Sequence, residues 1–469
     1  MKTDQDKKNT TIPLVTLTLL FFMWGFITCM NDILIPHLKE LFSLSYLMAM
    51  LVQFCFFGAY FIGSLVYFFI SYFYSDPINK IGYKNGILLG LLISAVGCVL
   101  FYPAAEYVQY FLFLSAFFIL GLGFTLLQIA ANPFVALLGD ERTASGRLNL
   151  VQGFNSLGTT IAPMVGGYMV FELFAEGESI SGEETKKPYL VFAAIFILLF
   201  VLVKIVKLPV FKNAQEETKG LGALKFPQLR MGALAIFCYV GAEVAIGSFL
   251  INFLNLPETI GVSEAVAKNY LALYWGGAMI GRFLAAISFN QNIPVVKKAL
   301  YMFVVAFTVF LLIFGMVNLT FEQLWVFPVL ILLNLLMFYI GKSIASRTLL
   351  LFATINVLLL ILAVSMGGQA AVWMVLAIGL FNSVMWSNIF TLSISGLQEY
   401  TSQGSSLLVM AILGGAIVPL IQGAIADFYG LQISFLLPVL CYTFIAWFGY
   451  FCHKNKLDTG GSTLMSSGH

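Results

Sequence analysis

The chain has 469 residues, of which 60% are hydrophobic and only 10% are charged, whereas a soluble domain carries roughly 25% charged residues. This composition excludes a soluble globular protein and indicates an all-α polytopic membrane protein whose surroundings are the lipid bilayer. At about 20 to 25 residues per span and a short loop, the length allows roughly 12 to 15 membrane helices. The net charge of +2 is small, and no nucleic-acid partner is expected.

Breaks at charged or Gly/Pro/Ser-rich interruptions predict about fourteen transmembrane helices. They lie near residues 13–38, 46–74, 85–104, 109–138, 148–171, 188–208, 230–254, 266–289, 298–317, 322–342, 348–366, 371–395, 405–425 and 432–452. The first apolar run is too long for a signal peptide and lacks a small-residue cleavage site, so we expect it to remain as helix 1.

The basic residues are distributed unevenly between the two sides of these spans. If the N-terminus is cytoplasmic, four of the 24 Lys and Arg residues fall outside, namely Lys39, Lys186, Lys187 and Lys268. The other twenty fall on the cytoplasmic side. The positive-inside rule therefore predicts that both termini are cytoplasmic.

Polar composition also indicates the domain organisation. Residues 209–229 form the longest polar cytoplasmic segment, which we interpret as a linker between an N-terminal six-helix bundle over 1–208 and a C-terminal bundle over 230–452. Residues 453–469 are predicted to form a cytoplasmic tail.

An internal repeat supports two related halves. Glu141-Arg142-Thr143-Ala144-Ser145-Gly146 resembles Glu399-Tyr400-Thr401-Ser402-Gln403-Gly404, about 258 positions later and in the same orientation. This spacing is typical of parallel halves related by an axis along the membrane normal. Two six-helix halves account for twelve helices, so we assign an inserted helix pair to about 293–342, where it preserves the orientation of everything downstream.

Two acidic residues lie within predicted spans. Asp32 is in helix 1 and Glu243 is in helix 7, and ionisable residues inside a membrane usually mark an ion or substrate path. Both are candidates for proton coupling, because a buried carboxyl group without a cationic partner can exchange a proton near neutral pH. In the alternative reading, Asp32 reaches the interface or caps a kink at Pro36, and Glu243 forms a structural hydrogen bond. Arg282 is expected towards a cytoplasmic end, away from either carboxylate.

Amide and aromatic side chains inside the spans are candidate substrate contacts, since they offer the hydrogen bonds and flat faces that a sugar requires. The candidates are Gln128, Asn132, Gln152, Asn155, Asn252, Tyr274, Trp275 and Asn382. Each of them could instead form hydrogen bonds between helices. As a set they favour a neutral polar substrate. The three histidines and six cysteines show no ligand spacing, so neither a metal site nor a cofactor is expected.

Six groups of residues, spread over nearly the whole chain, form recognisable motifs. They are Phe22-Met23-Trp24-Gly25-Phe26 with Asn31-Asp32-Ile33-Leu34-Ile35-Pro36, Gln128-Ile129-Ala130-Ala131-Asn132-Pro133, Tyr239-Val240-Gly241-Ala242-Glu243, Tyr274-Trp275-Gly276-Gly277-Ala278-Met279-Ile280-Gly281-Arg282-Phe283, Gly379-Leu380-Phe381-Asn382-Ser383 and Gly414-Gly415-Ala416-Ile417-Val418-Pro419. In this order they resemble the fucose/proton symporter family of the major facilitator superfamily, which includes fucose permease and bacterial glucose/galactose transporters.

The resemblance implies a major facilitator fold and proton-coupled hexose transport by alternating access, in the plasma membrane of a bacterium. It also implies that Asp32 carries the proton and that Gln152 contacts the sugar. Gln128 stands where the fucose branch has a glutamate, which favours the glucose/galactose branch. The inserted helix pair departs from the family's twelve-helix pattern and is expected to pack peripherally.

Four alternatives remain open. Two share the fold: a sodium-coupled sugar symporter, and an exporter of another small solute. The other two are an integral-membrane enzyme, for which no nucleophile or metal constellation is found, and a sugar sensor, for which the tails are short. We therefore expect a transporter and not an enzyme.

Overall fold

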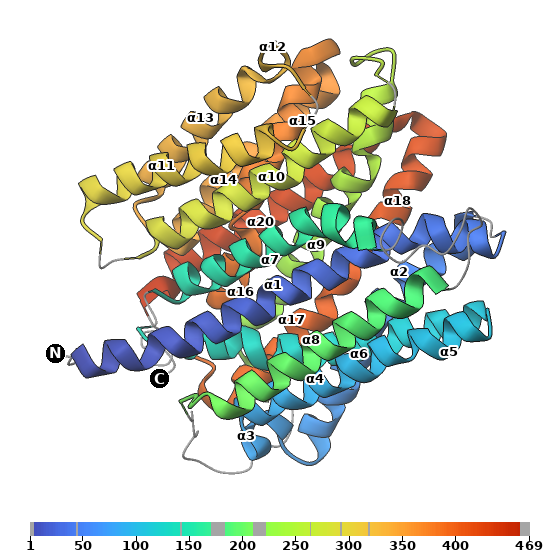
Figure 1. The fold of residues 1–469 in the computed structure, drawn as a ribbon. Coiled ribbons are helices and arrows are strands. Elements are labelled where there is room, and N and C mark those ends of the chain that lie inside the picture. Colours follow the sequence, from blue (N-terminus) through green and yellow to red (C-terminus); the bar gives the residue numbers. More distant parts are fainter. Residues whose placement is uncertain are drawn as a thin grey trace. The chain divides into compact units, whose positions relative to one another are not determined.

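The computed structural model describes residues 4–43, 46–140, 143–169, 183–209, 222–262, 264–290, 293–317 and 319–459, and these residues are mainly helical (Figure 1). The first half contains α1 (Asp4–Leu41), α2 (Tyr46–Phe73), α3 (Pro77–Ile81), α4 (Tyr83–Val99), α5 (Phe101–Glu106), α6 (Tyr110–Leu137), α7 (Ala144–Tyr168) and α8 (Glu183–Ile205). The second half contains α9 (Pro227–Asn255), α10 (Glu264–Ser288), α11 (Val295–Phe314), α12 (Phe321–Leu324), α13 (Val326–Gly341), α14 (Ala345–Ser365), α15 (Gly368–Asn382), α16 (Met385–Ile394), α17 (Thr401–Met410), α18 (Gly414–Tyr429), α19 (Leu431–Ser434) and α20 (Leu436–Lys454).

Thirteen helical stretches in the described residues are long and apolar enough to cross a membrane. Some of these stretches consist of two helices in succession, such as α15 with α16, and α17 with α18. The helix α7 is also long enough, with 25 residues, but it is richer in Gly, Ser, Thr and Asn. The prediction of an all-α membrane protein with about fourteen transmembrane helices is confirmed.

The helices pack into two compact units that exchange short segments. Unit 1 comprises residues 1–138, 157–225 and 397–410, and unit 2 comprises residues 139–156, 226–396 and 411–469. The start of α7 thus belongs to unit 2, whereas α17, from the second half of the chain, belongs to unit 1. The two exchanged segments begin at residues 139 and 397, which is the spacing of the sequence repeat.

Unit 1 is built around α4 and α6, which pack against each other, and α2 and α8 complete its core. Glycines allow the close approach, since a Cβ atom on Gly97 would lie 2.6 Å from the backbone nitrogen of Leu120. The short helix α3 begins at a buried N-cap, Asp76. Its Oδ1 accepts hydrogen bonds from the Tyr67 hydroxyl (2.6 Å) and the Ile78 backbone nitrogen (2.9 Å), which satisfies a donor at the helix start.

Unit 2 contains the helix pair that the sequence places in an insertion. The helices α11 and α13 pack on α10, α14 and α15 (Figure 1). In the α11 span only 28% of residues are buried, the smallest share among the thirteen spans. This low burial agrees with the expectation of peripheral packing for α11, whereas the span that contains α13 is 39% buried, as several other spans are.

One span of unit 2 is interrupted between α15 and α16, at Ser383 and Val384. The Ser383 hydroxyl donates a hydrogen bond to the backbone carbonyl of Leu380 (2.6 Å). A serine side chain that bonds to a carbonyl of the preceding turn competes with the backbone amide and bends a helix. The interruption therefore has a local cause in the sequence, although the span contains no proline there.

Candidate functional site

A buried carboxylate lies in the middle of α9. The Tyr239 hydroxyl, one helical turn earlier, donates a hydrogen bond to Glu243 Oε1 (2.6 Å). Residues four apart lie on the same helix face, so the sequence itself brings the hydroxyl to the carboxylate. The Glu243 side chain is only 12% exposed.

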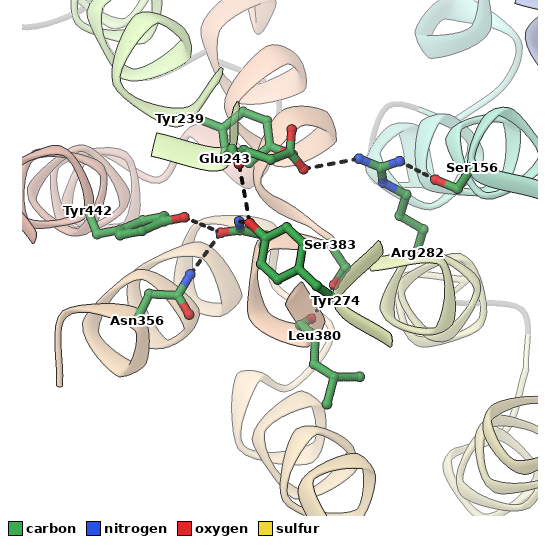
Figure 2. A network of polar contacts seen from close by, with 10 residues as sticks. Ser156, Tyr239, Glu243, Tyr274, Arg282, Asn356, Leu380, Ser383 and Tyr442 are labelled. Atoms are coloured by element: carbon green, nitrogen blue, oxygen red, sulfur yellow. Dashed lines mark hydrogen bonds and ion pairs between the residues drawn. The ribbon is translucent and has the colours of Figure 1, made fainter. Parts of the chain in front are cut away.

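Arg282 of α10 pairs with this carboxylate. Its Nη2 lies 3.6 Å from Glu243 Oε1, and its Nη1 donates a hydrogen bond to the Ser156 hydroxyl of α7 (Figure 2). The expectation that Arg282 lies away from the carboxylates is therefore wrong for Glu243. A long, flexible side chain can carry its charge several ångströms along a helix surface, and the residue's position in the span does not show this reach.

Asn382, at the end of α15, is the centre of a second set of contacts in unit 2. Its Nδ2 donates to the Tyr274 hydroxyl (3.1 Å), and its Oδ1 accepts hydrogen bonds from the Tyr442 hydroxyl (2.7 Å) and Asn356 Nδ2 (2.9 Å). The Tyr274 hydroxyl donates in turn to the backbone carbonyl of Glu243 (3.4 Å). The two sets form one polar network, drawn in Figure 2, that joins α7, α9, α10, α14, α15 and α20.

Glycines bring α10 and α15 close enough for these bonds. A Cβ atom on Gly379 of α15 would lie 2.2 Å from the Tyr274 carbonyl oxygen, and one on Gly281 of α10 would lie 2.1 Å from the Ser383 hydroxyl. Small residues at a helix interface allow such backbone approach in membranes. The close contact places Tyr274 against Asn382 and sets the starting point of the Arg282 side chain.

Three predicted site residues, Glu243, Tyr274 and Asn382, therefore come together. Trp275 is half-buried beside Tyr274, with ring centroids 5.1 Å apart. Asn252 lies further along α9 and is exposed. Five further residues of the network were not predicted as site residues, namely Ser156, Tyr239, Arg282, Asn356 and Tyr442. The four-residue spacing of Tyr239 and Glu243 is the one signal in the sequence that could have identified a contact of this network.

The remaining candidates fall in other places. Gln128 and Asn132 are buried on α6 in unit 1, where Gln128 hydrogen-bonds with Tyr60. Asn132 has no hydrogen-bond partner for either side-chain atom within the described part of the chain. Gln152 is buried and Asn155 is half-buried on the segment of α7 that belongs to unit 2. The side chain of Asp32 lies outside the described residues.

The chemistry of the unit 2 network suits a neutral ligand. Glu243 and Arg282 compensate each other's charge, and the rest of the network offers hydroxyl and amide groups. Among the residues that the structure describes, no three His, Cys, Asp or Glu side chains are grouped so that they could hold a metal ion.

Comparisons with known proteins agree with this architecture. The sequence profile of the Major Facilitator Superfamily matches residues 15–346. The chain is 43% identical over 458 residues to the glucose/galactose transporter of Brucella abortus biovar 1, with 96% of each chain covered. It is 30% identical over 465 residues to the L-fucose-proton symporter of Escherichia coli, with 94% of this chain and 93% of the relative covered.

A solved structure shares the fold. The crystal structure of FucP, a Major Facilitator Superfamily transporter in the outward conformation, superposes with a TM-score of 0.74 at 28% identity. The match covers 95% of this chain and 99% of that chain. The major facilitator fold that the resemblance implies is therefore confirmed.

Proposed function

Because the chain belongs to the Major Facilitator Superfamily, we propose that it is a secondary active transporter that moves a hexose of the glucose/galactose or fucose type together with a proton. The observation that carries the proposal is a buried polar network with a self-compensating ion pair, in a chain that is similar over nearly its whole length to a glucose/galactose transporter. Hydroxyl and amide groups match the hydroxyls of a neutral sugar.

In the proposed cycle the two halves of the chain, with the linker at 209–229 between them, rock about a site near the middle of the membrane. Both termini lie in the cytoplasm of a bacterial cell, and the protein resides in its inner membrane. The substrate contacts come from the network residues Tyr274 and Asn382, together with Trp275 and Asn252. On the other candidate helices they are Gln128, Asn132, Gln152 and Asn155.

Asp32 is the main proposed proton carrier, because it is an acidic residue inside the first membrane span. Glu243 is the second. Since Arg282 lies 3.6 Å from its carboxylate, a proton and the guanidinium group compete for the same oxygen atoms. Protonation of Glu243 would break its ion pair with Arg282, which would remain hydrogen-bonded to Ser156.

Uptake into energised membrane vesicles tests the function. Glucose, galactose, fucose and mannose are compared with and without a proton-selective uncoupler, and with and without sodium, against vesicles that lack the protein. We expect sodium-independent accumulation of a hexose that the uncoupler abolishes. Sodium-dependent accumulation would instead support a sodium symporter, and absence of uptake for all four sugars would contradict hexose import.

Asp32→Asn tests the proton carrier in the same vesicles. The amide cannot exchange a proton, so uphill accumulation should be lost while exchange of labelled for unlabelled sugar across the membrane persists. Full proton-driven accumulation by this variant would remove Asp32 from the mechanism.

A further inference from the structure

The helix pair α11 and α13 departs from the twelve-helix pattern, and one polar residue connects it to the network of unit 2. The sequence of α13 is VFPVLILLNLLMFYIG, in which Asn334 is the single amide. Asn334 is fully buried. Its Nδ2 donates a hydrogen bond to the backbone carbonyl of Leu380 on α15 (3.3 Å).

The acceptor of this bond lies at the interruption between α15 and α16. The Leu380 carbonyl already accepts a hydrogen bond from the Ser383 hydroxyl (2.6 Å; Figure 2). A backbone carbonyl displaced from the helical pattern inside a membrane has no water to bind, and neighbouring side chains must satisfy it. Ser383 does so from within the span, and Asn334 does so from the neighbouring helix.

Packing of α13 alone does not account for this residue. The Oδ1 atom of Asn334 is buried and has no hydrogen-bond partner in the part of the chain that the structure describes. A buried amide with only half of its bonding groups satisfied is less favourable than an apolar side chain of similar size. The remaining benefit of an amide is the bond that it donates to the carbonyl.

The interruption lies beside two groups of the network. Asn382, which binds Tyr274, Tyr442 and Asn356, is the last residue of α15. Ser383 packs directly against Gly281 of α10, and Arg282 is the next residue. A shift of the bent segment would therefore move both Asn382 and the backbone that carries Arg282.

We propose that Asn334 is a positioning residue, through which the inserted helix α13 holds the bend between α15 and α16 and so keeps Asn382 in place for substrate binding. This inference rests on the proposed function for its link to substrate, although the effect on the bend is independent of transport.

Three variants separate this role from simple packing. Asn334→Leu removes the donor and keeps the branched shape of the side chain. Ile331→Ala, one turn earlier on the same buried face of α13, loosens the docking of the helix without removing a bond to Leu380. Ser383→Ala removes the other donor, and its combination with Asn334→Leu shows whether the two donors act on one structure.

The first readout is hydrogen exchange of the backbone amides at 380–388 in the purified protein, which requires no transport. Asn334→Leu should increase exchange there, and Ile331→Ala should leave it near the wild-type level even if its melting temperature falls. Equal exchange in both variants, or no change in Asn334→Leu, would overturn the proposal.

The second readout is the kinetics of sugar uptake. For Asn334→Leu we expect KM to rise by about three- to tenfold while Vmax per molecule changes less than about twofold, because a displaced Asn382 weakens binding. Ile331→Ala should retain the wild-type KM. In the double variant Asn334→Leu/Ser383→Ala, the factor by which KM rises should be smaller than the product of the factors in the two single variants. If the wild-type protein takes up no sugar, the proposed function fails, but the hydrogen-exchange experiment still tests the bend. If the wild-type protein takes up sugar and Asn334→Leu has the same KM, the link between Asn334 and substrate binding is refuted.

Discussion

Glu243 and Arg282 show how the value of an ion pair depends on its surroundings. Both side chains are mostly buried, at 12% and 14% exposure, so each charge has lost most of its water. In such a site the attraction roughly offsets the cost of desolvation, and the loss of one partner leaves the other charge uncompensated. We therefore expect the largest loss of stability when only one of the two residues is replaced by an uncharged one.

Arg282→Met should lower the free energy of unfolding by about 3–5 kcal/mol, because it strands the Glu243 carboxylate. The double variant Arg282→Met/Glu243→Gln should recover more than half of this loss, since an amide oxygen can still accept the bond from Tyr239. Thermal unfolding of the purified protein measures both. A double variant as unstable as the single one would show that Arg282 acts by packing and not by charge.

Asp76, on a loop outside the spans, is a buried carboxyl group whose protonation affects the stability of the fold. Burial raises the pKa of its carboxyl group to about 6, although hydrogen bonds from Tyr67 and the backbone of Asn79 and Ile78 act in the opposite direction. A raised pKa in the folded state means that the folded protein binds the proton more tightly than the unfolded chain, whose carboxyl group titrates near 3.8. The associated stability is fully present below about pH 4 and is lost as the pH rises through 6.

Asp76→Asn should remove this pH dependence. Between pH 4 and pH 7 the wild-type protein should lose on the order of 2–3 kcal/mol relative to the variant, because the amide retains the N-cap acceptor without a charge. Melting curves of both proteins across this range test the prediction. Parallel curves would contradict it, whereas Asp76→Ala should be less stable by about 1 kcal/mol even at low pH because the cap is lost.

At the scale of elements, the contact between α10 and α15 determines the geometry of the network. It rests on backbone approaching backbone at Gly379 and Tyr274. A side chain added at that point could not be accommodated by a rotamer change of a neighbour, because the neighbouring atoms belong to the main chain.

Gly379→Ala should separate the two helices and weaken the Tyr274–Asn382 bond, at a cost of about 1–3 kcal/mol. Gly423→Ala on α18 is the matched control. Its added Cβ would meet only the Phe249 ring at 3.5 Å, so the higher helix propensity of alanine should leave stability unchanged or raised. The melting temperatures of the two variants should move apart, and a similar decrease in both would refute the steric explanation.

The helices were predictable from the sequence, whereas many of their side-chain partners were not. Hydropathy and the count of basic residues fixed the number of spans, because bilayer thickness and the charge rule act on whole segments. The partner of Glu243 was missed because helix periodicity says nothing of how far Arg282 reaches. Tyr442 and Asn356 lie 60 and 26 residues from Asn382, and only the packed fold brings them together.

At the scale of the whole molecule, the two exchanged segments are held by polar contacts. In unit 2 the Ser145 hydroxyl of α7 lies 2.6 Å from that of Thr391. In unit 1 the Ser402 hydroxyl of α17 donates to the Tyr83 hydroxyl (3.2 Å), and Gln403 Nε2 donates to the Ser71 hydroxyl (3.2 Å). Such groups can exchange their partners for water at little net cost, so these segments are suited to leave their unit during a transport cycle.

A disulfide between Ser145→Cys and Thr391→Cys should hold the exchanged part of α7 on α16. Under oxidation this double variant should lose sugar exchange, and a reductant should restore it, because the proposed cycle requires the segment to part from unit 2. The single-cysteine variants and the wild-type protein, treated with the same oxidant, are the controls. Undiminished exchange with the crosslink demonstrably formed would contradict a moving α7.

The exchange of segments also bears on how the protein is made. The core of unit 1 includes residues 397–410, where α17 packs on α2 and α6. Ribosomes add roughly 5–20 residues per second, so α2 and α6 remain without α17 for about ten seconds or more after the linker has been synthesised. The first half of the chain therefore reaches the membrane before its own core can be completed.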